Sequence, residues 1–209
     1  MLTFQQITDM YPASMQGMAP KHMLVEYLQY ELLDSLFREQ PAGRLCFIGD
    51  TAIRICYHGS RFSEDLDFDN FGMSFADFQS LLERPIANMH QKGFETEIRF
   101  VEKGAYHCYI RFPRILFEQG LSPLEGEKIL VRIDTVNREQ NYHPQVTTLN
   151  RFGIFRDILV APAEILLAQK LLTIVGRKRE KGRDFFDVSF LAGSTRPDRE
   201  YLCRVFGAD

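Results

Sequence analysis

The sequence lacks the apolar segments that secretion or membrane insertion would require. No apolar run approaches the roughly 18 residues of a membrane span. The first residues, Met-Leu-Thr-Phe-Gln-Gln, contain neither the basic start nor the apolar stretch of a signal peptide. We therefore expect a cytoplasmic protein with no membrane partner.

Metal-binding cysteines and a large excess of charge are also missing. The four cysteines show no C-x-x-C spacing and three lie in apolar runs, which favours buried free thiols over a zinc site or a disulfide. The 25 Lys and Arg against 28 Asp and Glu leave a net charge of −3, so any nucleic acid must bind a local patch. The five histidines show no ligand spacing and no paired nucleophile, which speaks against histidine-based catalysis.

What is present is enough apolar sequence for one domain, with 45% hydrophobic and 12% aromatic residues in 209. The apolar spacing predicts helices and strands in mixed order, an α/β (α+β) fold with a small mixed sheet and a helical C-terminal part. Pro85 is a candidate kink. We expect a core over 1–155, including an N-terminal helix, and a helical C-terminal segment over 156–209. The predicted helices are 21–39, 51–57, 75–93, 162–175 and 183–191, and the predicted strands are 44–48, 66–68, 95–102, 106–115 and 128–136.

Two aspartates, Asp65 and Asp67, flank a leucine at the predicted strand 66–68. Positions two apart on a strand face the same way, so both carboxylates would project from one face. Such charges repel unless a divalent cation neutralises them, and oxygen ligands suit Mg²⁺ or Mn²⁺. The alternative is a solvated acidic strand end, because Asp69 and Asn70 follow directly.

A third acid is Asp134, which ends the apolar run from Ile129. A carboxylate on such a strand needs a partner if it is buried, so Asp134 is a candidate third metal ligand. The alternative is an aspartate that ends its strand and faces water.

A glycine turn at Gly49 lies between a predicted strand and a predicted helix. Backbone N–H groups at a helix start, with the positive end of the helix dipole, bind phosphate oxygens well. Downstream, the basic segment 177–183 could bind phosphates of a donor or an RNA, or could form a solvated helix end.

Taken together, residues 47–68, FIGDTAIRICYHGSRFSEDLDF, resemble the core of the AbiEii/AbiGii toxin family of nucleotidyltransferases, which reads approximately GGTALR…YG..R.SEDLDF. A second stretch, PAEILLAQK at 162–170 followed by Arg177 and RDFFDV at 183–188, is similar to the family's EILAEKL.A…R…RD.YDL segment.

The resemblance implies a polymerase β-like nucleotidyltransferase fold and a role for each matching residue. It implies catalytic roles for Lys170 and Asp184 beside the carboxylates, and a nucleoside triphosphate as donor. The implied metal ligands are Asp65 and Asp67, to which Asp134 is added as the candidate third ligand from its strand, and the nucleotide-binding residues are Gly49, Thr51, Arg54, Ser63, Lys170 and Arg177.

The implied reaction moves a nucleoside monophosphate to an acceptor hydroxyl, with tRNA as the expected acceptor. Family members act as toxins of bacterial toxin–antitoxin or phage-exclusion systems, so a cognate antitoxin is an implied partner. Two alternatives stay open: a non-catalytic module that binds nucleotide, RNA or a partner on the same fold, and a small-molecule nucleotidyltransferase.

The sequence departs from the family pattern at Asp50, where a glycine or serine is usual. A carboxylate beside a triphosphate would repel it by about 1 kcal/mol or more. Alternatively, Asp50 caps its helix and points away from the pocket. The chain also ends at Asp209, where relatives commonly continue into further helices, so we expect a shortened member or a fragment.

Overall fold

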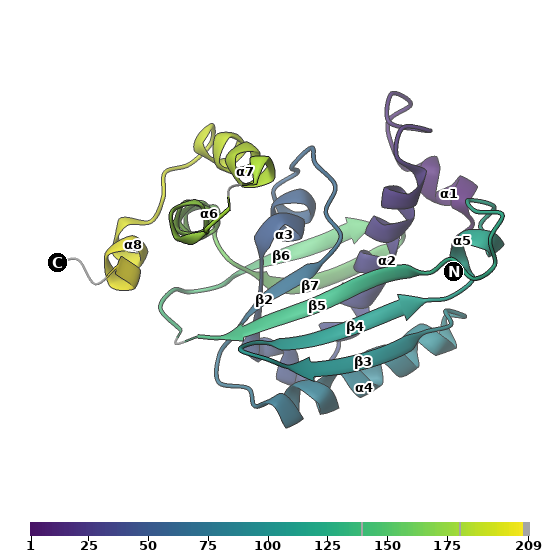
Figure 1. Cartoon of the computed structure of the whole chain (residues 1–209), viewed down its shortest axis with the longest axis horizontal. Coiled ribbons are helices and arrows are strands. Elements are labelled where there is room, and N and C mark those ends of the chain that lie inside the picture. The colour runs from purple at the N-terminus through teal and green to yellow at the C-terminus, as the bar shows by residue number, and fades with distance from the viewer. Residues whose placement is uncertain (139, 180, 207–209) are drawn as a thin grey trace.

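One mixed sheet positions most of the residues that the sequence singles out. The structure is a computed structural model that describes residues 1–138, 140–179 and 181–206. Its strands are arranged in the order β3-β4-β5-β2-β1-β7-β6 (Figure 1). The strands are β1 Leu45–Ile48, β2 Leu66–Asn70, β3 Glu97–Glu102, β4 Tyr106–Phe112, β5 Ile129–Asn137, β6 Gln145–Arg151 and β7 Ile154–Val160.

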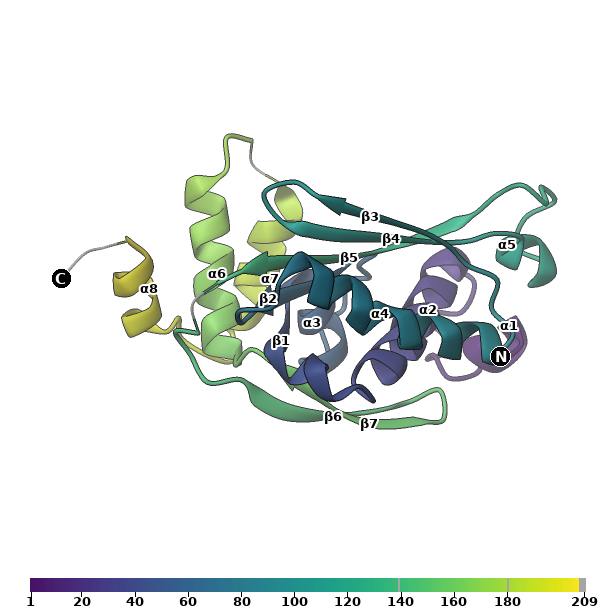
Figure 2. The same cartoon turned by 90° about the horizontal axis from the view of Figure 1, so that it is seen from below.

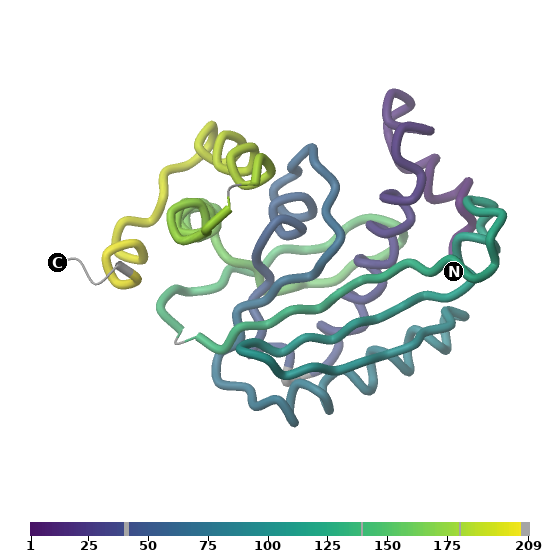
Figure 3. The backbone as a smooth tube through the Cα atoms, in the orientation of Figure 1, coloured from purple at the N-terminus to yellow at the C-terminus, as the bar shows by residue number. Residues whose placement is uncertain are grey.

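The helices confirm the mixed α/β class that the sequence predicts. Those at the C-terminal end lie together beside one end of the sheet (Figure 3). The helices are α1 Phe4–Thr8, α2 Pro20–Leu36, α3 Gly49–Cys56, α4 Phe75–Gln91, α5 Ile115–Glu118, α6 Ala163–Gly176, α7 Gly182–Ala192 and α8 Arg199–Phe206, with a 3₁₀ turn, η1, at Gln40–Arg44. None of the described helices is long and apolar enough to cross a membrane.

The sheet is larger than predicted because β6 and β7 form a hairpin that the sequence pattern did not indicate. Leu149 is the buried residue of β6, so this edge strand shows little apolar alternation. β7 pairs in parallel with β1 through Phe47 and Val160. The predicted division between 155 and 156 falls inside β7, and residues 207–209 of the C-terminal segment lie outside the described part of the chain.

The main core lies between the sheet and helices α2 and α4. α4 continues through Pro85, and Phe78 packs edge-on against Phe100 of β3. Among the cysteines, Cys46 and Cys108 are buried and free, as expected, whereas Cys56 is half-buried and Cys203 is exposed. Figure 2 shows α4 and α2 on the same side of strands β3 to β5.

The opposite face of the sheet carries the acidic residues. Leu66 and Phe68 of β2 are buried in the core, so Asp67 between them points to the other face. Asp67 pairs in register with Asp134 on the parallel neighbour β5. The fold thus places two of the three predicted acids on adjacent strands and on one face.

Candidate active site

An arginine links the outer two of the three acids. Arg132 lies two residues before Asp134 on β5, so both side chains share a face. Its Nη2 donates a hydrogen bond of 2.7 Å to Asp65 Oδ2, and its Nε lies 2.8 Å from Asp134 Oδ2. On the far side, His107 Nδ1 lies 2.8 Å from Asp134 Oδ1. Asp65 and Asp134 are therefore bridged by one guanidinium.

Burial and the negative charges nearby bring the pKa of Asp67 close to neutral pH. Burial, followed by the charges of Asp134, Asp65 and Asp50, raises the pKa of Asp67 to about 7. Burial also raises the pKa of Asp65, although Arg132 opposes this. A nearby cation would favour the ionised form of both groups.

The donor chemistry of this site suits a hard divalent cation. Asp65 and Asp67 both contribute carboxylate oxygens to this site, which is the ligand type that Mg²⁺ and Mn²⁺ prefer. Within the described residues, no three acids, histidines or cysteines converge as a complete ligand set. The fit therefore rests on the carboxylate pair and on the raised pKa of Asp67.

The glycine turn brings the start of α3 against these carboxylates. Gly49 has φ +77°, and a Cβ built on it would lie 2.7 Å from Asp67 Oδ2. Two residues on, the fully buried Thr51 donates its hydroxyl hydrogen bond to the carbonyl oxygen of Asp65. Gly49 permits the close approach of α3 and Asp67, and the hydrogen bond from Thr51 holds the loop that carries Asp65 against α3.

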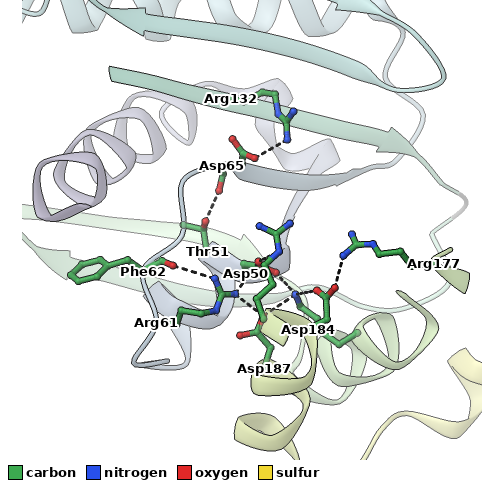
Figure 4. A network of polar contacts seen from close by, with 11 residues as sticks. Asp50, Thr51, Arg61, Phe62, Asp65, Arg132, Arg177, Asp184 and Asp187 are labelled. Atoms are coloured by element: carbon green, nitrogen blue, oxygen red, sulfur yellow. Dashed lines mark hydrogen bonds and ion pairs between the residues drawn. The ribbon is translucent and has the colours of Figure 1, made fainter. Parts of the chain in front are cut away.

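A cluster of ion pairs joins α3 to helices α6 and α7 (Figure 4). Lys170 on α6 is 7% exposed, and its Nζ lies 2.8 Å from Asp187 Oδ2 and 3.2 Å from Asp184 Oδ1. The same ammonium pairs with Asp50. Arg61 Nη2 lies 2.9 Å from Asp50 Oδ2 and 2.8 Å from Asp187 Oδ2.

Asp50 is ionised within this cluster. Burial acts to raise its pKa, but Lys170 and Arg61 hold the pKa at about 2. The N-cap of α3 is Ile48, and Asp50 lines the cavity described below, so its carboxylate does not cap the helix and point away. Lys170 and Arg61 therefore offset part of the negative charge that Asp50 presents at the cavity.

These elements enclose a cavity of about 850 Å³ between the sheet, α3 and α6. Of the predicted site residues, Thr51, Arg54 and Asp134 do not line it. Arg54 instead pairs with Glu26 of α2 at 2.5 Å and donates to the carbonyl oxygen of Gly59 at 2.8 Å. The predicted residues that do line the cavity are Gly49, Ser63, Asp65, Asp67, Lys170, Arg177 and Asp184.

The basic segment is only partly directed at the cavity. Arg177 and Arg183 line it, and Arg177 pairs with Asp184. Lys178, Arg179 and Lys181 are exposed, as expected of a solvated helix end, and Glu180 lies outside the described residues.

Two cavity residues, Arg61 and Arg132, were missed by the sequence interpretation. Arg61 stands at the isolated arginine of the family's YG..R.SEDLDF pattern, so the resemblance contained its signal. Arg132 could have been found from its position two residues before Asp134 on a strand.

Solved structures of other proteins share this fold. The structure is similar to MenT4, a nucleotidyltransferase toxin from Mycobacterium tuberculosis H37Rv, with a TM-score of 0.70 and 20% identity over 98% of this chain and 68% of that one. It is also similar to JHP933 from Helicobacter pylori, with a TM-score of 0.58 and 21% identity over 83% of this chain and 67% of that one. A search of curated proteins finds no match.

The family follows from the sequence itself. The profile described as "Nucleotidyl transferase AbiEii toxin, Type IV TA system" matches residues 31–208. The chain belongs to this AbiEii family and is a nucleotidyltransferase, which confirms the resemblance drawn from residues 47–68 and 162–188.

Proposed function

We propose that this protein transfers a nucleoside monophosphate from a nucleoside triphosphate to a hydroxyl of an RNA, with tRNA as the expected acceptor, and depends on Mg²⁺ or Mn²⁺. The observation that carries the proposal is the contact between the start of α3 at Gly49 and the carboxylate of Asp67, at the wall of the cavity. Phosphate-binding N–H groups and metal-binding oxygens thereby meet at one place.

The proposal gives roles to residues that line the cavity and to Asp134, which lies beside Asp67 on the neighbouring strand. The triphosphate lies against the start of α3 and near Lys170 and Arg177, which offset its charge. The acceptor oxygen attacks the α-phosphorus, the bond to the β-phosphate breaks, and pyrophosphate leaves. The hydroxyl proton passes to Asp134, which is paired with His107. A cation bound by Asp65 and Asp67 would offset charge on the phosphates and activate the attacking oxygen.

The family context extends the proposal to the cell. AbiEii proteins are toxins of type IV toxin–antitoxin systems, so we propose a cognate antitoxin as partner. We also propose a cytoplasmic location, because the donor and the tRNA acceptor are cytoplasmic molecules. A role in phage defence is proposed from the family resemblance.

The test is incubation of the protein with Mg²⁺, each α-labelled nucleoside triphosphate in turn and total bacterial tRNA, followed by a denaturing gel. Asp65→Ala is the loss-of-function variant. Asp157→Ala is the matched control, because Asp157 lies on β7 and does not line the cavity. Label on tRNA that disappears only with Asp65→Ala supports the proposal.

Other outcomes point to the two alternatives. Nucleotide binding without label on any molecule favours a binding module, for which the bridging of Asp65 and Asp134 by Arg132 is the supporting observation. Label on a small molecule, with none on RNA, identifies a small-molecule nucleotidyltransferase. Label that persists in folded Asp65→Ala contradicts the mechanism.

A further inference from the structure

The uncovered face of β3, β4 and β5 carries a row of side chains that leads to the carboxylates. Arg99 on β3 is opposite Tyr109 on β4, and Tyr109 is opposite Arg132 on β5. Arg132 in turn bonds Asp65. With strands about 4.8 Å apart, the three spacings from β3 to β2 span about 14 Å. The row thus connects the edge of the sheet to the reaction site.

A second arginine lies one step along the same face. Arg111 follows Tyr109 by two residues on β4, so their side chains point the same way. The alternate residues Cys108 and Ile110 are fully buried in the core. In Figures 1 and 2, no described helix lies over the face that carries Tyr109 and Arg111.

Two arginines of this face, Arg99 and Arg111, are not paired with acids in the part of the chain that the structure describes. Among the described residues, neither Arg99 nor Arg111 forms an ion pair, and Arg99 is exposed. The acid opposite Arg111 is Glu97, which pairs with Lys128 at 2.6 Å. A chain that is acidic in total therefore keeps a local basic surface with an aromatic ring in its middle.

We propose that this face binds the single-stranded end of the RNA acceptor, which crosses the sheet from β3 and presents its terminal hydroxyl at Asp65 and Asp67. The proposal rests on the proposed function above. Arg99 and Arg111 contact phosphates, and a base stacks on Tyr109. Arginines around an aromatic ring suit a single strand, because they bind the backbone while the ring takes up the base.

The test measures binding separately from catalysis. A fluorescein-labelled tRNA with a single-stranded 3′ end is titrated with the full chain, without nucleoside triphosphate, over a series of KCl concentrations. The variants are R99Q/R111Q, Tyr109→Ala and Tyr109→Phe. Arg84→Gln is the matched control, because Arg84 is an exposed arginine on α4, which packs on the other face.

We expect R99Q/R111Q to weaken binding and to reduce the slope of log K against log[KCl] by about 1.4, since each phosphate contact to a single strand contributes about 0.7. Tyr109→Ala weakens binding roughly fivefold or more, as loss of base stacking does, whereas Tyr109→Phe keeps the ring and the affinity. Arg84→Gln leaves both quantities unchanged. Thermal unfolding checks that all variants are folded.

Three results would overturn the inference. One is an affinity for tRNA that is the same in R99Q/R111Q, Tyr109→Ala and Arg84→Gln. Another is label transfer to a polypeptide whose KM rises in R99Q/R111Q, which would assign the face to a protein acceptor. The third is Asp65-dependent labelling of tRNA with an unchanged KM in R99Q/R111Q, in which case only this inference fails. If the wild-type protein neither binds nor labels RNA, the proposed function fails with it.

Discussion

Gly49 and Asp67 approach each other so closely that a side chain on Gly49 would collide with the carboxylate. A Cβ there would lie 2.7 Å from Asp67 Oδ2 and 3.1 Å from Asp67 Cβ. Glycine is also the residue best suited to φ +77° at this turn. The start of α3 and the carboxylate can share one space only because this position has no side chain.

Gly49→Ala should therefore impair both folding and activity. The left-handed backbone costs about 1–2 kcal/mol for a residue with a Cβ, and the collision with Asp67 adds to it. We expect a loss of more than about 2 kcal/mol in the free energy of unfolding, measured in urea, with nucleotide transfer abolished.

Gly72→Ala is the matched control for this prediction. Gly72 has φ +81°, but a Cβ there would meet nothing within 4 Å. Gly72→Ala should lower the free energy of unfolding only by the cost of the left-handed backbone, about 1–2 kcal/mol, and leave nucleotide transfer unchanged. Equal effects of the two substitutions would show that contact with Asp67 is irrelevant.

Metal affinity should depend on pH through Asp67. A proton competes with a cation for a carboxylate, and the pKa of Asp67 is about 7. Affinity for Mn²⁺, measured by calorimetry, should fall about tenfold per pH unit below 7 and level off above it. Asp67→Asn should bind Mn²⁺ weakly and with little dependence on pH over this range. A flat profile in the wild-type protein would contradict the assignment.

The same pKa has a consequence for the metal-free fold. The pKa of Asp67 is raised from about 3.9 in an unfolded chain, so its contribution to stability is full below about pH 4 and is lost as pH rises through 7. Asp67→Asn removes the ionisable group. In the presence of a chelator, the melting temperature of Asp67→Asn should exceed that of the wild type at pH 8 and not at pH 4.

Lys170 should be essential for the fold as well as for the reaction. Its ammonium forms ion pairs with Asp50, Asp184 and Asp187, all of them largely buried. Lys170→Met leaves these acids short of a partner, and breaking a buried ion pair costs about 3–5 kcal/mol. Urea unfolding should show a loss of this size. Lys103→Met, at an exposed turn position, should stay within about 0.5 kcal/mol of the wild type.

Asp50→Asn should tighten donor binding while it weakens the fold. Removing one negative charge at the cavity lowers repulsion of a triphosphate by about 1 kcal/mol, roughly a fivefold gain in affinity. Calorimetry with a non-hydrolysable ATP analogue measures this gain. Asp187→Asn removes the same charge from the same cluster, but Asp187 does not line the cavity. This variant should therefore destabilise the fold and give a smaller gain in affinity for the ATP analogue. An unchanged affinity in Asp50→Asn would mean that the cluster already screens this charge.

The local sequence pattern was sufficient to predict the part of the site formed by Gly49, Asp65 and Asp67. The strand, turn and helix around Gly49 and the alternation at Asp65 and Asp67 depend on neighbours in sequence, and the structure places these elements as expected. The roles of Arg61 and Arg132 depend on partners far along the chain. The spacing of Arg132 from Asp134 indicates a shared face, but it does not reveal the bond to Asp65, which lies 67 residues away.

Two of the missed elements share a physical cause. β6 is a strand at the edge of the sheet with little buried surface, and α8 is a short helix in which Tyr201 is fully buried. Neither has the long apolar period from which an element is recognised. Arg54 was assigned to the nucleotide from its place in the motif, whereas its geometry joins α3 to Glu26.

The ion pair between Lys170 and Asp50 spans 120 residues of sequence, which sets an order of events during synthesis. The ribosome releases α3 and the strand bearing Asp67 long before α6 and α7. Until residues 163–192 emerge, the acids of the nascent chain have no lysine or Arg177 beside them, and the cavity has only one wall. The active site is therefore complete only after those helices have been translated, and the chain has no transferase activity while it is being synthesised.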